Sequence, residues 1–104
     1  MVELEPIILD GYTFTAVVVK LPKTTLLTVS NEVGYIMCGA LDVKLLNEKL
    51  SDRGIIAGRA TGVKTIEQLI NAPLESVTIK AEQLGIKPGT TGKEALIIMA
   101  KSIL

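Results

Sequence analysis

The chain has 104 residues, and its 11 basic and 11 acidic side chains leave no net charge. A neutral chain with two tyrosines and one phenylalanine lacks the electrostatic field and the stacking surfaces that bind nucleic acid, so we expect no nucleic-acid partner. The length suits a single domain over residues 1–104, and an apolar content of 48% is high for a small domain, which indicates a subunit interface.

Missing residue types narrow the possible chemistry. The sequence has no histidine, the commonest general base and metal ligand, so we expect no metal and no cofactor. Cys38 is the single cysteine, which excludes an internal disulfide and is compatible with a reducing cytoplasm. The first residues lack a signal-peptide pattern, and no apolar run reaches the roughly 18 residues of a membrane span. We therefore expect a soluble cytoplasmic protein without a membrane partner.

The amino-terminal third of the chain predicts antiparallel strands. An apolar segment from Val2 to Leu9 is joined by Asp10-Gly11, a strong hairpin signal, to a second one from Tyr12 to Lys20. Two further short runs, from Leu26 to Ser30 and from Tyr35 to Cys38, are separated by a turn. These segments predict a four-stranded antiparallel start.

A βαβ unit is predicted next. Apolar residues recur at helical spacing from Leu41 to Leu50, and Gly54 is placed to end that helix in a left-handed conformation. The segment from Ile55 to Gly58 is again typical of a strand. Because the crossover makes the two flanking strands parallel, their carboxyl ends, which carry Cys38 and Arg59, are expected at one edge of the sheet.

The rest of the chain is mainly helical in pattern. Thr65-Ile66-Glu67-Gln68 and Thr91-Gly92-Lys93-Glu94 are capping boxes that predict a short helix and a final helix running to Leu104. The segment from Leu74 to Leu84 fits both a strand and a helix, and its length together with Gly85 favours a helix. The whole pattern predicts an α+β fold with a mixed sheet of about five strands, one βαβ crossover and three to four helices.

Three residues near the two parallel strand ends are candidates for catalysis. Cys38, expected directly before a helix, is either a nucleophile with a lowered pKa or a buried residue that fills the core. Asp42 either caps the first helix or accepts a proton. Arg59 shares a strand face with apolar residues, and either holds a carboxylate or phosphate or forms a structural ion pair, for example with Asp42.

The loop from Gly58 to Thr65 joins a strand to a helix, as a phosphate-binding loop does. Its glycine spacing does not match a Walker motif, so ordinary helix capping competes with an anion site at this position. If a small anionic ligand binds along this edge, the expected contacts are Gly39, Thr61, Gly62, Lys64 and Thr65. Residues 88–93 could form a similar anion site, and the neutral charge argues against a DNA contact there.

Several stretches of the sequence resemble the YunC-like family, a bacterial and archaeal domain of unknown function. The resemblance is carried by Gly34-Tyr35-Ile36-Met37-Cys38-Gly39-Ala40-Leu41-Asp42, Arg53-Gly54-Ile55, Ala57-Gly58-Arg59-Ala60 and Ala72-Pro73-Leu74-Glu75-Ser76-Val77-Thr78, and it extends to Leu21-Pro22-Lys23-Thr24 and Leu84-Gly85-Ile86. It implies a small α+β domain over nearly the whole chain. The family has no established activity to carry over.

Two hypotheses of function follow. In the first, Cys38, Asp42 and Arg59 form a small-ligand or thiol-dependent enzymatic site, which requires the Cys38 and Arg59 side chains to converge on one cleft. In the second, the protein is a non-catalytic homo-oligomeric module. The unbroken apolar run from Ala95 to Ala100 predicts a homo-oligomer, with a dimer favoured, that buries the final helix or an exposed sheet edge.

Overall fold

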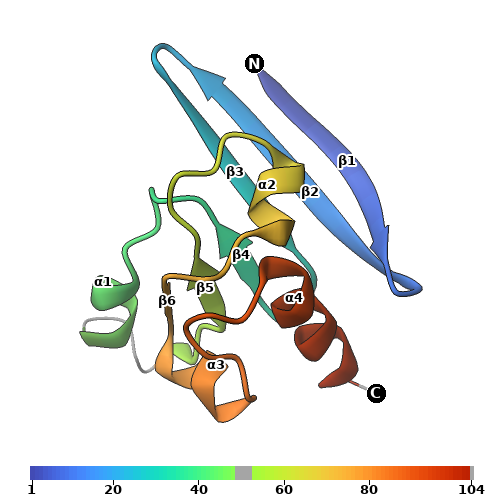
Figure 1. The fold of residues 1–104 in the computed structure, drawn as a ribbon, viewed down its shortest axis with the longest axis vertical. Helices are drawn as coiled ribbons and strands as arrows, with labels where there is room; N and C mark the ends of the chain where they lie inside the picture. The colour runs from blue at the N-terminus through green and yellow to red at the C-terminus, as the bar shows by residue number, and fades with distance from the viewer. Residues whose placement is uncertain (49–52, 104) are drawn as a thin grey trace.

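A mixed sheet of six strands, in the order β1-β2-β3-β4-β5-β6, runs through the molecule (Figure 1). The computed structural model describes residues 1–48 and 53–103. β4 and β5 pair in parallel and the other neighbours pair antiparallel, which confirms the α+β fold, with one strand more than expected. The strands are β1 (Val2–Leu9), β2 (Tyr12–Leu21), β3 (Thr24–Ser30), β4 (Tyr35–Met37), β5 (Ala57–Arg59) and β6 (Ser76–Val77).

The first hairpin forms where the sequence predicts it. Asp10 and Gly11 have φ angles of 53° and 84°, so both turn residues adopt the left-handed conformation that a tight two-residue hairpin requires. The two strands pair from Leu9 and Tyr12 outward, with Val2 opposite Val19 at the far end. This register places alternate residues of both strands on the same face.

Within the described residues, four helices pack around the sheet: α1 (Val43–Glu48), α2 (Ile66–Asn71), α3 (Ile79–Gln83) and α4 (Gly92–Lys101). Helices α2 and α4 contact each other and cover one face, against β3 and β4, whereas α1 packs on β5. The first helix begins at Val43 instead of Leu41, and the part predicted over residues 49 and 50 lies outside the described residues. Helix α4 ends at Lys101, and residue 104 is also outside them.

The segment from Leu74 to Leu84 is not one helix, contrary to expectation. Ser76 and Val77 pair with Arg59 and Gly58 as strand β6, and the helix begins only at Ile79. Thr78 separates the two elements: its buried hydroxyl oxygen accepts hydrogen bonds from the backbone N–H of Ala57 at 3.1 Å and of Ala81 at 3.3 Å. One side chain therefore continues the β5 pairing and caps α3.

The main core lies between the sheet and helices α2 and α4. On the sheet side it is built from side chains that alternate along the strands, and on the helix side from the inner face of α4 (Phe14, Ala16, Leu27, Val29, Ile36; Ala95, Leu96, Met99, Ala100). Leu96 and Met99 are 0% exposed, and Ile97 and Ile98 are half-buried. Much of the apolar run in the final helix is therefore covered by the domain itself.

Candidate functional site

A hollow of about 690 Å³ opens on the side of the sheet where α1 lies, beside the parallel step between β4 and β5. We call it the Arg59 pocket. It is lined by the loop before α1, by α1 itself, by the ends of β5 and β6, and by two more distant side chains (Gly39, Ala40, Leu41, Asp42, Val43, Lys44, Asn47, Glu48; Arg59; Glu75, Ser76, Val77; Glu82, Pro88). The pocket therefore lies at the predicted edge of the sheet.

Arg59, the last residue of β5, is fixed in the wall of this pocket by three hydrogen bonds. Its Nε and Nη2 donate to the carbonyl oxygen of Gly39 at 3.2 and 3.0 Å, and its Nη1 donates to Glu75 Oε2 at 3.0 Å. The predicted structural ion pair exists, but its partner is Glu75 and not Asp42. A guanidinium has five N–H groups, so two remain for which the structure shows no acceptor among the described residues.

Glu75 and Ser76, which lie beside Arg59, are two of the pocket residues that sequence analysis missed. Glu75 precedes β6, where its backbone N–H donates to the carbonyl oxygen of Arg59 at 2.7 Å. Ser76 lies opposite Arg59 in the β5–β6 pair, and its hydroxyl donates to Glu75 Oε2 at 3.2 Å. A strand assignment for Ser76 and Val77 would have revealed both residues, because it brings them alongside Arg59.

Asp42 acts as a helix cap. Its Oδ1 accepts a hydrogen bond from the backbone N–H of Leu45 at 2.9 Å, and its carbonyl oxygen accepts one from Leu46 at 3.2 Å. The capping alternative is thus the one that the geometry supports. Asn47, further along α1, accepts a hydrogen bond from the backbone N–H of Ile79 at 2.9 Å, which ties α1 to the start of α3.

The structure does not bring Cys38 and Arg59 together as expected. Arg59 is paired with Met37 across the parallel step, so Cys38, the next residue, points to the opposite face. Cys38 is 6% exposed in the main core, and its Sγ accepts a hydrogen bond from the backbone N–H of Leu27 at 3.5 Å. It does not directly precede a helix either, because α1 begins five residues later at Val43. The core-filling alternative therefore describes its position.

This burial makes thiol reactivity a direct test. We expect Cys38 of the folded protein to react with a small aromatic disulfide at least about 100-fold more slowly than the same thiol in denaturant. The reason is that the reagent can reach the buried thiol only when the surrounding structure opens locally. The rate should be followed against pH by absorbance, with glutathione as the control thiol. Fast labelling of the folded protein near neutral pH would contradict the buried position.

The residues predicted to contact an anionic ligand lie in two separate parts of the structure. Gly39, Arg59 and Thr61 lie together: a Cβ built on Gly39 would be 3.7 Å from Arg59 Nη2 and 3.9 Å from the Thr61 methyl carbon. Gly62, with a φ of 73°, turns the chain away. Lys64 lines a separate hollow of about 490 Å³ with Lys23, beyond the β2–β3 turn.

Thr65 is used for capping. Its hydroxyl oxygen accepts a hydrogen bond from the backbone N–H of Gln68 at 3.1 Å, and Gln68 Oε1 accepts one from the backbone N–H of Lys64 at 2.7 Å. The predicted capping box of α2 is therefore formed, with the glutamine reaching the residue before the cap. Thr91 caps α4 in the same way, through the backbone N–H of Glu94 at 3.2 Å.

The described residues form neither a metal-binding cluster nor a membrane-spanning helix. Within residues 1–48 and 53–103, no three acidic or cysteine side chains come close enough to hold a metal ion. None of the helices in this part of the chain combines the length and the apolar character needed to cross a membrane.

The fold and the pocket define a class of small α+β domain, with a sequential six-stranded sheet and a polar hollow beside the parallel pair β4 and β5. The chain belongs to the family described as a domain of unknown function, DUF1805, whose model matches residues 37–99. It is 66% identical to the uncharacterized protein YunC of Bacillus subtilis over 101 residues, which cover 97% of this chain and 100% of that protein.

A solved structure agrees with the fold. The crystal structure of a protein of unknown function from Thermoplasma acidophilum superimposes with a TM-score of 0.85, at 27% identity, over 95% of this chain and 93% of that one. The resemblance to the YunC-like family is thus confirmed. These relatives bring no activity with them.

Proposed function

We propose that the protein binds a small polar ligand in the Arg59 pocket, with an anionic group of the ligand held by Arg59. The observation that carries this proposal is a guanidinium held by three hydrogen bonds to two acceptors in the wall of a 690 Å³ hollow, with two N–H groups left to donate. An arginine oriented in this way is suited to a carboxylate or a phosphate. The volume falls within the roughly 300–1,000 Å³ of small-molecule sites.

The charges around the pocket restrict the ligand further. Four carboxylates line it, from Asp42, Glu48, Glu75 and Glu82, against two cations, Lys44 and Arg59. A ligand with several negative charges would be repelled by this surplus of acid. The pocket therefore favours a ligand that combines one anionic group with hydrogen-bond donors or a positive group. Cys38 has no part in this proposal, because it lies in the core behind the sheet.

A thermal-shift screen of small charged metabolites tests the proposal. We expect at least one compound at about 100 times its Kd to raise the free energy of unfolding by roughly 2.7 kcal/mol, and Arg59→Gln to abolish that shift. The variant should stay folded, because a partly exposed ion pair such as Arg59–Glu75 contributes only about 0–1 kcal/mol.

Arg53→Gln is the matched control, since Arg53 is an exposed arginine that does not line the pocket. It should keep the full shift. A hit whose effect survives in Arg59→Gln would show that the compound binds elsewhere, and would count against the Arg59 pocket.

A non-catalytic homo-oligomeric module is the second candidate. It is favoured by large apolar side chains that protrude from β1: Val2, Leu4 and Ile8 are 62%, 68% and 71% exposed. We further propose that the protein is located in a reducing compartment, the cytoplasm, because the only cysteine of the sequence is a free thiol. The two candidates are compatible, since the protruding residues lie outside the Arg59 pocket.

A further inference from the structure

We infer that the Arg59 pocket binds a free basic α-amino acid, of the kind of lysine, ornithine or arginine. The inference rests on the ligand site proposed above and names the class of its ligand. Arg59 holds the α-carboxylate, Glu75 accepts a hydrogen bond from the α-ammonium group, and acidic residues on the helix side of the pocket hold the cationic side chain. Each of these three contacts corresponds to a separate feature of the pocket.

The end of β5 presents donors for a carboxylate. Arg59 Nη1 and Nη2 carry two N–H groups each, and each nitrogen donates one of them, Nη1 to Glu75 Oε2 and Nη2 to the carbonyl oxygen of Gly39. The two remaining N–H groups therefore belong to different nitrogens of the guanidinium. A carboxylate has two oxygens, so it can accept both of these hydrogen bonds at once.

Glu75 places an acceptor directly beside these donors. Its Oε2 accepts from Arg59 Nη1 at 3.0 Å and from the hydroxyl of Ser76 at 3.2 Å, whereas for Oε1 the structure shows no donor among the described residues. A positive and a negative group thus lie side by side, each with hydrogen-bonding capacity left. In an α-amino acid the carboxylate and the ammonium group are attached to one carbon atom, so the ligand offers a matching pair of opposite charges.

The remaining charges favour a cationic side chain on this ligand. Asp42 precedes α1, Glu48 ends it and Glu82 lies on α3. All three line the pocket, together with a single lysine, Lys44, and none of the three acids forms an ion pair within the described residues. Three carboxylates and one ammonium group leave two negative charges beyond the neutral ion pair at β5. A cationic side chain offsets one of them, whereas an acidic side chain adds to the surplus.

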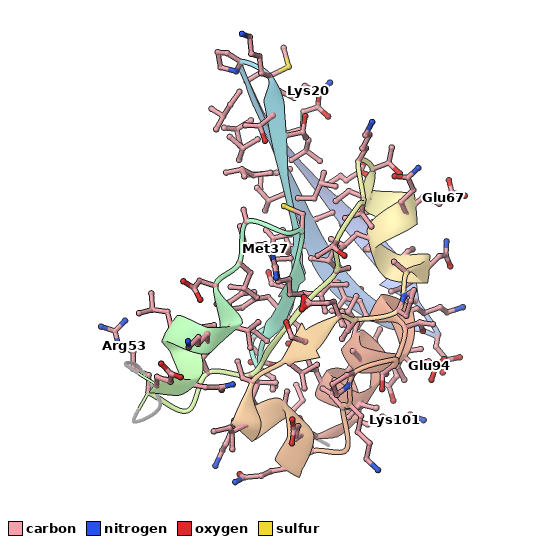
Figure 2. The ribbon with its side chains drawn as sticks, turned by 60° about the vertical axis from the view of Figure 1, so that its left-hand side comes forward. Lys20, Met37, Arg53, Glu67, Glu94 and Lys101 are labelled. Atoms are coloured by element: carbon pink, nitrogen blue, oxygen red, sulfur yellow. The ribbon has the colours of Figure 1, made fainter. Side chains whose placement is uncertain are left out.

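Helices α1 and α3 form the side of the pocket that faces the ligand's side chain. Figure 1 and Figure 2 show both helices at the end of the molecule that carries β5 and β6, away from the β2–β3 turn. The hydrogen bond from the backbone N–H of Ile79 to Asn47 joins the two helices. A ligand that contacts both the strand ends and these helices must extend away from its α-carbon. Three or four methylene groups with a terminal charge provide this extension.

The hollow beyond the β2–β3 turn differs in its charges. It is lined by Lys23 and Lys64 and by no acidic residue. It therefore offers no carboxylate to an ammonium group, and it repels a cationic side chain. We expect the basic amino acid to bind in the Arg59 pocket and not in this second hollow.

Thermal-shift measurements with free amino acids test the inference. We expect at least one of L-lysine, L-ornithine and L-arginine at about 10 mM to raise the melting temperature of the full chain, and L-glutamate to give no shift. The Nα-acetyl form of that amino acid lacks the α-ammonium group, and its decarboxylated amine lacks the carboxylate. Both analogues should bind at least roughly 10-fold more weakly than the amino acid itself.

Glu82→Gln tests the contact with the side chain. Removing the charge of Glu82 should weaken binding of the basic amino acid by roughly 2- to 5-fold in a calorimetric titration, whereas Arg59→Gln should abolish binding. Glu67→Gln is the matched control, because Glu67 is exposed on α2, lies away from α1 and α3 in Figure 2 and does not line the pocket. It should leave the affinity unchanged.

Three results would overturn the inference: no shift with any of the basic amino acids, equal binding of the Nα-acetyl form, or an unchanged affinity in Glu82→Gln. A different anionic compound whose shift disappears in Arg59→Gln would then leave the proposed anion site standing and remove only its ligand class. If no compound gave a shift that depends on Arg59, the site and its ligand class would both fail.

Discussion

Replacing Gly92 by alanine will destabilise the protein by about 1–3 kcal/mol or more, because the first residue of α4 has no room for a Cβ. An alanine Cβ there would lie 2.5 Å from the carbonyl oxygen of Leu69, 2.7 Å from Ile36 Cδ1 and 3.0 Å from the Cα of Ile70. Two of these neighbours are backbone atoms of α2, so α2 and α4 would have to move apart. Urea unfolding followed by circular dichroism measures the loss.

Gly39→Ala is the control for this substitution. A Cβ at Gly39 meets its nearest atom at 3.7 Å, which is an ordinary contact, and the structure shows no positive φ there. Because alanine also restricts the unfolded chain, we expect Gly39→Ala to change the free energy of unfolding by less than about 1 kcal/mol. Equal effects of the two substitutions would mean that Gly92 is not at a close helix contact.

Replacing Leu96 by alanine will cost about 2–5 kcal/mol, which is a large part of the roughly 5–15 kcal/mol that stabilises a small domain. Leu96 is 0% exposed and packs in the core beneath the sheet, so its removal leaves a cavity that the surrounding strands cannot close. Thermal and urea unfolding should both show the loss.

Ile103→Ala provides the comparison, since Ile103 follows α4 and is 52% exposed. We expect it to cost less than about 1 kcal/mol. The contrary result is that Leu96→Ala lowers the free energy of unfolding no more than Ile103→Ala does, and also dissociates a dimer. That result would mean that the final helix is an interface and not part of the core of its own domain.

Local signals predicted the elements that depend on local interactions. Asp10-Gly11 formed its hairpin, and Thr65 and Thr91 capped the helices that their motifs indicated. In each case the interacting groups lie within four residues of one another, so the sequence contains all that is needed. The antiparallel start was predicted from its turn signals, and the parallel step from the helical crossover between its two strands.

The candidate site depends on register, which local signals do not contain. Both strand ends were correctly placed at one edge, yet the parallel pairing sets Met37, and not Cys38, beside Arg59. A shift by one residue reverses the face of every side chain in a strand. Cys38 is therefore in the core and Arg59 in the pocket, although both end neighbouring strands.

Strand β6 was missed because a two-residue strand has no measurable period. Ser76 and Val77 pair with β5 through contacts about eighteen residues apart in the chain, and the helical spacing of Leu74, Val77 and Ala81 suggested one helix. Because β6 was missed, Glu75 was not recognised as the partner of Arg59. Glu75 approaches Arg59 only because β6 pairs antiparallel with β5, a fact of tertiary structure.

The strand order of the sheet follows the order of the chain without exception, and this has a consequence for biosynthesis. Each strand pairs with the one made just before it, so a nascent chain can extend the sheet step by step as it leaves the ribosome. The covering helix α4 is made last. Until it docks, Ile36 of β4 lacks the helix that shields it from water. During synthesis the sheet therefore exposes apolar side chains on both of its faces. Chaperones that hold exposed strands would matter most at this stage.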